Sequence, residues 1–159
     1  MTNGREKSGP AVVAMKPANK AGKRRRFPAP VHGGSFTEAQ IQTVLLTDAV
    51  VNACTWAVAF HTTLALKEGL NPADVQAIRE GRLPKDGKLA ALSALVRTMI
   101  EKRGRLDDQD VDRSIAAGFG KDHALEVIAI VAASTITNYT GSITKTPLEA
   151  SFQAHSWAG

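Results

Sequence analysis

The feature that most constrains the fold is an apolar stretch, residues 37–69, that contains almost no helix breaker. It holds the only cysteine of the chain, Cys54, together with Trp56 and His61. Apolar residues would cover most of the circumference of a helix formed here, so we expect this segment to be buried from several sides. Asn52 is the expected break between two helical halves. Such a segment needs other helices to pack against it, from the same chain or from a second subunit.

The remaining body of the chain also carries helical signals and no strand alternation of useful length. Capping residues and glycines mark the expected helix ends, and aromatic residues make up only 5% of the sequence. After a first helix that begins near Ser35 or Thr37, we expect helices at residues 72–81, 85–103, 109–117, 121–138 and about 146–154. The sequence therefore predicts an all-α fold.

Residues 1–35 are expected to form a flexible basic arm, and residues 36–159 a single helical domain. The first 26 residues hold eight Lys or Arg and one Glu, a net charge of +7, whereas the other 133 residues hold twelve basic and fourteen acidic residues. The basic run at residues 23–26 could contact nucleic acid or an acidic partner. It has no interleaved aromatic residues and no folded reading element, so we expect a solvated tail and no nucleic-acid partner.

Several kinds of site are not expected. One cysteine excludes an internal disulfide and any multi-cysteine zinc site. His32, His123 and His155 lack metal-ligand spacing to one another or to carboxylates, so we expect no metal and no cofactor. No uninterrupted apolar run reaches the roughly 18 residues of a membrane span, and the basic N-terminus lacks the apolar region of a signal peptide. We therefore expect no membrane segment and a cytoplasmic protein.

Cys54 and His61 are the candidate reactive residues. In one regular helix they would share a face at a separation of about 10.5 Å along the axis, because each residue rises about 1.5 Å. A direct hydrogen bond between them would then be out of reach. Each residue also has a purely structural interpretation, Cys54 as a small buried apolar residue and His61 as a hydrogen-bonded core histidine.

The segment Asn52-Ala53-Cys54-x-x-Ala57-x-x-x-His61 lies at the junction of the two apolar helical halves. It resembles the signature of the carboxymuconolactone decarboxylase and alkyl hydroperoxidase D-like superfamily. That signature is a glutamate, eleven residues, and then Cys-x-x-Cys-x-x-x-His. Downstream segments at residues 117–119, 124–128, 138–140 and 146–148 match as well, so the resemblance covers roughly residues 36–152.

The resemblance implies an all-helical bundle whose helices pack between subunits into trimers or hexamers. In the peroxidase branch of the family, the second cysteine is the thiol attacked by peroxide, and the first cysteine resolves it as a disulfide. The histidine and the glutamate form a proton relay, and a partner protein supplies electrons. We accordingly expect a homo-oligomer in which Cys54 and His61 face a common pocket made by packed subunits.

Two positions depart from the family pattern. Ala57 stands at the second cysteine and Gln42 at the glutamate, so a Cys-x-x-Cys redox cycle within one chain is excluded. Of the family's site residues, only Cys54 and His61 are present in this chain. Asp48, six residues before Cys54, is a candidate to replace the missing carboxylate. The alternative interpretation of Asp48 is an ordinary aspartate that lies at the surface or is paired within its helix.

Besides nucleic-acid association through the basic arm, which is the weakest hypothesis, two functions remain open from the sequence. The first is an alkyl hydroperoxidase-like thiol oxidoreductase with a one-cysteine site, in which Cys54 is the thiol and an external thiol or dithiol regenerates it. His61 would relay protons or orient the reacting groups, and Gln42, Asp48 and Trp56 would assist the relay or line the pocket. The second is a non-redox family member whose degenerate site binds a small ligand or serves as an oligomeric scaffold.

Overall fold

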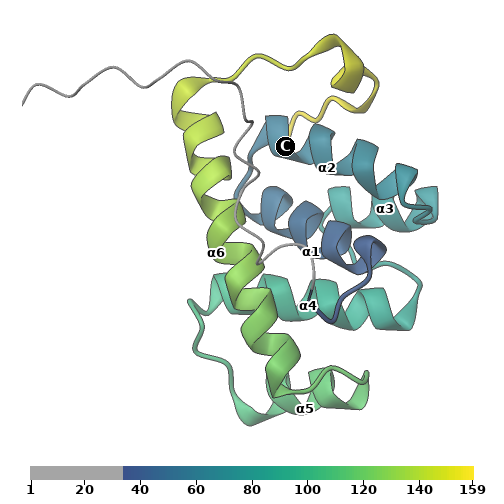
Figure 1. The fold of residues 1–159 in the computed structure, drawn as a ribbon, viewed down its shortest axis with the longest axis vertical. Helices are drawn as coiled ribbons and strands as arrows, with labels where there is room; N and C mark the ends of the chain where they lie inside the picture. Colours follow the sequence, from purple (N-terminus) through teal and green to yellow (C-terminus); the bar gives the residue numbers. More distant parts are fainter. Residues whose placement is uncertain (1–33) are drawn as a thin grey trace, which may run out of the picture.

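The computed structural model of the protein describes residues 34–159 (Figure 1). No strand occurs in this range, and the predicted all-α class is confirmed. The elements in order are α1 (Glu38–Val51), α2 (Thr55–Lys67), α3 (Pro72–Arg79), α4 (Gly87–Glu101), α5 (Asp108–Ala116), α6 (Lys121–Thr144) and the 3-10 helix η1 (Ala150–His155). The expected arm, with its basic run at residues 23–26, lies outside the described residues except for Gly34 and Ser35.

α1 is the central helix, and α2, α4 and α6 pack around it (Figure 1). Nine consecutive residues of α1, residues 41–49, are buried, as its apolar circumference predicts. The apolar side chains among them enter two core clusters, one shared with α4 and α6 and the other with α2 and α3. Burial of each large aliphatic side chain contributes about 1.5–3 kcal/mol. The largest of these are Ile41, Leu46, Ile78, Leu92 and Ile130.

Helix starts follow the capping signals in the sequence. The Thr37 hydroxyl accepts from the Gln40 N–H at 3.3 Å, and the Gln40 side chain accepts from the Thr37 N–H at 2.9 Å, a capping box that begins α1. Asn71 caps α3, with Pro72 in the first turn. Asp107 caps α5 with the same reciprocal pair of hydrogen bonds. The sequence signals therefore place the helices that position the site.

Two expected boundaries are wrong. α6 continues past Asn138 and through Gly141 to Thr144, and the left-handed conformation of Lys145 ends it. The last helix begins at Ala150 and is a 3-10 turn of six residues, not an α-helix from residue 146. Glu149 has an extended backbone (φ −65°, ψ 151°) and is the N-cap residue, so the helix starts only after it.

The C-terminal segment folds back over α2 (Figure 1). Arg79 fastens it by donating to the backbone oxygens of His155 and Ser156, each at 2.9 Å. The Trp157 indole donates to the backbone oxygen of Arg79 at 3.1 Å. The C-terminal segment therefore lies against both α2 and the end of α3.

By length and composition alone, α6 is apolar enough to cross a membrane. It has 24 residues and a mean hydropathy of 1.2 in its most apolar window, of which 22% is buried. The expectation that no segment of membrane length occurs holds for uninterrupted apolar runs but not for this helix. Core helices of soluble proteins meet the same criteria. One side of α6 packs against the core, where Val127 and Ile130 are buried.

Candidate functional site

The chain turns sharply between α1 and α2, where Asn52 predicts a break. Asn52 caps the end of α1, and Ala53 takes the left-handed conformation with φ 50°. The N–H of Ala53 donates to Val50 O and that of Cys54 to Ala49 O, both at 3.0 Å, which is a Schellman motif. Glycine usually occupies the left-handed position, and an alanine there costs about 1–2 kcal/mol. The surrounding packing must offset this cost.

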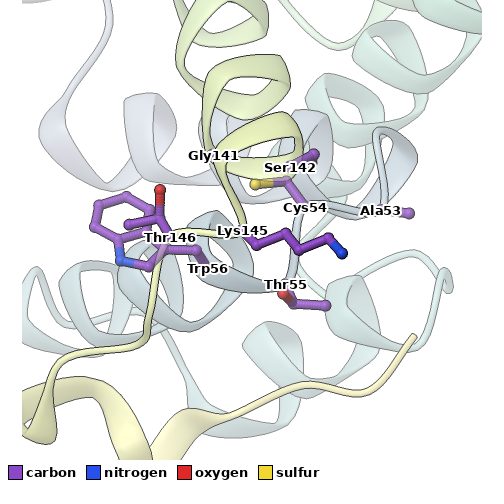
Figure 2. A pocket seen from close by; sticks show the side chains of 8 residues that line it. All are labelled: Ala53, Cys54, Thr55, Trp56, Gly141, Ser142, Lys145 and Thr146. Carbon is purple, nitrogen blue, oxygen red and sulfur yellow. The ribbon is translucent and has the colours of Figure 1, made fainter.

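Cys54 is both the end of this turn and the N-cap residue of α2. Its side chain makes no capping hydrogen bond and is 2% exposed. It faces a pocket of about 330 Å³, which we call the thiol pocket (Figure 2). In Figure 2 the sulfur lies beside the last turn of α6, and a Cβ placed on Gly141 would lie 3.5 Å from Sγ. The lining residues are Ala53, Cys54, Thr55, Trp56, Gly141, Ser142, Lys145 and Thr146.

His61 lies in a different pocket of about 320 Å³, which we call the imidazole pocket. Trp56 lines both pockets, but Cys54 lines only the first and His61 only the second. Within residues 34–159, Cys54 and His61 therefore line different pockets, and the expected common pocket made by packed subunits stays a prediction for the assembled protein. The turn at Ala53 is the reason for this separation, because Cys54 precedes the first turn of α2 and no longer shares the face of His61. The lining residues are Leu45, Trp56, Ala57, Phe60, His61, Ala133, Ser134 and Thr137.

Gln42 of α1 fixes the His61 ring. Its Oε1 lies 3.0 Å from Nδ1, and both side chains are buried. Because the amide oxygen accepts, Nδ1 carries the hydrogen and Nε2 keeps its lone pair. Within residues 34–159, Nε2 makes no hydrogen bond. Burial lowers the pKa of His61 to about 4, so the imidazole is neutral at physiological pH.

Aromatic side chains build one wall of the imidazole pocket. Trp56 and Phe60 stack with ring centroids 5.0 Å apart, and Phe60 meets the His61 ring edge-on at 5.0 Å. Phe152 from η1 packs against Phe60 at 5.2 Å. The Trp56 indole donates to Glu149 Oε2 at 2.8 Å. The C-terminal segment therefore holds the aromatic wall in place.

Asp48 lies on α1 and lines neither pocket. It is fully buried and accepts from the Nδ2 groups of Asn52 and Asn138, each at 2.8 Å. Burial raises the pKa of Asp48 to about 6, and hydrogen bonds from Ser134, Asn52 and Asn138 act in the opposite direction. Ser134 also lines the imidazole pocket. Asp48 is thus connected to that pocket through Ser134 and has no direct place in it.

Sequence reasoning gave no role to the α6 side chains at the site. Asn138 is fully buried, and its Oδ1 is without a hydrogen-bond partner in the described part of the chain. The sequence feature that could have pointed to Asn138 is an amide side chain inside an apolar helix, four residues after Ser134. Asn138 and Asp48 are 90 positions apart, so no local spacing connects them.

The site therefore offers one hydrogen-bond acceptor in an apolar cavity and one thiol in a separate cavity. Residues 34–159 contain no group of three or more His, Cys, Asp or Glu side chains that could hold a metal ion. No protein-family model matches the chain, and no curated protein matches it.

Proposed function

We propose that the chain is a non-redox member of the carboxymuconolactone decarboxylase and alkyl hydroperoxidase D-like superfamily, and that its imidazole pocket binds a small apolar ligand. One observation carries this proposal: Ala57 and a neutral His61 face the imidazole pocket, whereas Cys54 faces the other one. Covalent thiol chemistry needs its nucleophile and its base beside the same substrate. A methyl group stands where the family pattern has the attacked thiol.

The walls of the imidazole pocket support a definite ligand class. Leu45, Trp56 and Phe60 supply aliphatic and aromatic surface, and the cavity of about 320 Å³ suits a ring compound of modest size. The His61 Nε2 lone pair is a hydrogen-bond acceptor in this apolar surrounding. A matching ligand is therefore a small ring compound with a hydroxyl or N–H group that donates to Nε2.

The proposal includes assembly into a homo-oligomer, a trimer or a hexamer as the resemblance implies, and a cytoplasmic location. The support on the described surface is the large apolar side chains that α6 leaves exposed, among them Ile136 and Ile143. Exposed apolar groups of this size are typical of protein contacts. α6 also supplies Ala133 and Thr137 to the imidazole pocket, so a subunit contact along α6 would lie close to the ligand.

The experiment is a fluorescence titration with N-phenyl-1-naphthylamine, a neutral probe of one phenyl and one naphthyl group whose N–H can donate to Nε2. Thr137→Phe fills the imidazole pocket from an exposed position of α6, and Ser142→Phe, also exposed on α6, is the matched control in the thiol pocket. We expect Thr137→Phe to weaken binding by about tenfold or more, which corresponds to about 1.4 kcal/mol. Ser142→Phe should bind as the wild type does. Absence of binding by the wild type, or equal loss in both variants, would falsify the proposal.

A second candidate function is a one-cysteine thiol oxidoreductase that reduces small hydroperoxides. The observation in its favour is that Cys54 lines a pocket of about 330 Å³ together with the cationic Lys145. The sulfur would take the distal oxygen of the hydroperoxide and release an alcohol. An external dithiol would reduce the resulting sulfenic acid and release water.

This second candidate is tested by hydroperoxide consumption in the presence of an external dithiol. Wild type and Cys54→Ser are compared, with Ser142→Phe as a variant that blocks the same pocket while keeping the sulfur. Faster consumption by the wild type than by both variants supports the thiol reaction. Equal rates for wild type and Cys54→Ser eliminate it.

A further inference from the structure

α6 carries a continuous apolar stripe on the side that faces away from the core. Four of its large side chains are more than half exposed: Leu125 at 67%, Ile136 at 65%, Tyr139 at 56% and Ile143 at 81%. Together with the exposed Ala132, these residues follow steps of seven, four, three and four, which is the spacing of a helix seam. We call these five residues the α6 stripe.

The stripe lies opposite the buried face of the same helix. The buried residues of α6 are Val127, Ile130, Ser134 and Asn138, and at 3.6 residues per turn they fall on the other side of the helix from the stripe. No charged residue occurs between Val127 and Thr144. A helix face exposed to water ordinarily carries charged or polar residues. The α6 stripe therefore has the composition of a covered surface.

The absence of charge favours a copy of the same stripe as its occupant. An uncharged seam of aliphatic residues and one tyrosine offers no charged group by which a different partner could be selected. A second copy presents an identical apolar seam with the same spacing, so every residue of the stripe finds an apolar counterpart. Two-fold pairing of one patch with itself is the commonest way for such a surface to be buried.

Charges at the ends of α6 decide the orientation. Lys121 precedes Leu125 by four residues and therefore lies on the stripe side of the first turn. In an antiparallel pair, the N-terminal end of each helix, with Lys121 and Asp122, lies near the C-terminal end of the partner helix, which carries Lys145 and unpaired carbonyl groups of partial negative charge. In a parallel pair, the two like helix ends would lie side by side. The opposed helix dipoles therefore favour the antiparallel pair.

We infer that α6 pairs with α6 of a second copy of this chain in an antiparallel, two-fold contact centred between Ala132 and Ile136. Leu125 then lies beside Ile143 of the partner subunit, and Ala132 beside Ile136 of the partner subunit. This inference deepens the assembly part of the proposed function and rests on it. A two-fold contact requires an even number of subunits, so of the trimer and the hexamer in the proposed function it selects the hexamer and excludes an isolated trimer.

Sedimentation analysis of the full chain tests whether the stripe is the contact. Ile136→Glu places a charge in the middle of the stripe, and Leu83→Glu is the matched control at another exposed leucine, which is 51% exposed. We expect the wild type and Leu83→Glu to contain an even number of chains. Ile136→Glu should contain half as many or fewer. A monomeric or trimeric wild type, or an unchanged mass for Ile136→Glu, would overturn the inference.

Cross-linking tests the orientation in a Cys54→Ser background, in which no other cysteine is present. Leu125→Cys and Ile143→Cys are prepared as separate proteins and then oxidised alone or after mixing. The two positions are about 27 Å apart along one helix, so antiparallel pairing predicts linked dimers only in the mixture. Linked dimers from either protein alone would show parallel pairing and contradict the inference.

A lipid surface is the competing occupant of the stripe, and flotation with vesicles of phosphatidylcholine and phosphatidylserine distinguishes it. Flotation of a monomeric wild type that Ile136→Glu abolishes would assign the stripe to a membrane. The experiments also distinguish a wrong α6 contact from a wrong proposed function. If Ile136→Glu keeps its oligomer, or if the wild type is a trimer, the α6 contact is wrong, while the probe titration at Thr137 still decides ligand binding.

Discussion

The thiol pocket and the imidazole pocket are of similar volume, about 330 and 320 Å³, and Trp56 lines both, yet their chemistry differs. The thiol pocket combines Cys54 with a lysine and several hydroxyl groups. The imidazole pocket combines His61 with aromatic and aliphatic walls. Two residues that are seven positions apart therefore belong to two different sites.

A single backbone feature produces this difference. The left-handed Ala53 lies between the end of α1 and the start of α2, which begins two residues later at Thr55. Cys54 therefore occupies a cap and not a helix face. Ala57 and His61, both inside α2, stay one turn apart on the same face. Residue spacing therefore predicts which side chains share a face within α2, but it fails for Cys54, which precedes the first residue of this helix.

The largest expected effect comes from moving a thiol into the imidazole pocket. In the double variant Ala57→Cys with Gln42→Glu, a sulfur and a carboxylate-paired imidazole would adjoin one cavity. The distal oxygen of a hydroperoxide then passes to the new sulfur, and an external dithiol reduces the sulfenic acid. We expect hydroperoxide consumption to rise on the order of a hundredfold above wild type, the usual size of a general acid–base contribution.

The control for this variant is Ala57→Cys with Gln42 retained, which should show a smaller gain because the neutral amide gives the imidazole no negative partner. Peroxidase assays of the three proteins at one dithiol concentration make the comparison. If neither variant exceeds the wild type, the imidazole pocket does not have the family geometry.

The second prediction concerns stability against pH. Histidine in the unfolded chain binds a proton below about pH 6.5, whereas His61 stays neutral down to about pH 4, so acidification across this window destabilises the fold. Asp48 acts in the opposite sense, because its native pKa of about 6 exceeds the ordinary value of 3.8 and the folded state takes up the proton first. Each effect is on the order of 3 kcal/mol, so they nearly cancel between pH 4 and 6.

Asp48→Asn removes one side of this balance. We expect its free energy of unfolding to fall by about 3 kcal/mol between pH 6.5 and 4, while that of the wild type changes little over the same range. Urea unfolding at a series of pH values measures both curves. Parallel curves for the two proteins would show that His61 and Asp48 do not titrate in opposition.

The third prediction concerns Trp56, the side chain that the two pockets share. Trp56→Ala deletes the ring that stacks on Phe60 and donates to Glu149. We expect probe binding to weaken by roughly tenfold and alkylation of Cys54 by iodoacetamide to become faster. Trp56→Phe keeps an aromatic wall and should lose less affinity. Unchanged alkylation in Trp56→Ala would mean that this side chain does not limit access to the sulfur.

The smallest expected effect lies at the turn between the pockets. Ala53→Gly relieves the left-handed alanine and should stabilise the protein by about 1 kcal/mol, measured by urea unfolding. Arg103 is the matched control, because it has φ 52° in an equivalent turn after α4. Arg103→Gly should give a similar gain. Destabilisation by Ala53→Gly alone would show that the alanine side chain is needed for packing in the thiol pocket.

The sequence predicted the helices well and the site only in part. Caps such as Thr37, Asn71 and Asp107 act over three or four residues, so their signals are local and readable. The break at Asn52 was also readable. The left-handed Ala53 was not, since alanine carries no signal for that conformation. The contacts of Asp48 with Asn138 and the supply of α6 residues to the imidazole pocket depend on tertiary packing, which no spacing in one sequence reveals.

An NMR titration of His61 tests most directly whether His61 and Cys54 have separate surroundings. The spectrum is recorded before and after alkylation of Cys54 with iodoacetamide, and the His61 signal is assigned by its loss in His61→Gln. Separate pockets predict a midpoint near pH 4 in both samples, as burial of the imidazole requires. A midpoint that moves toward the ordinary histidine value once the sulfur is alkylated would contradict the separation.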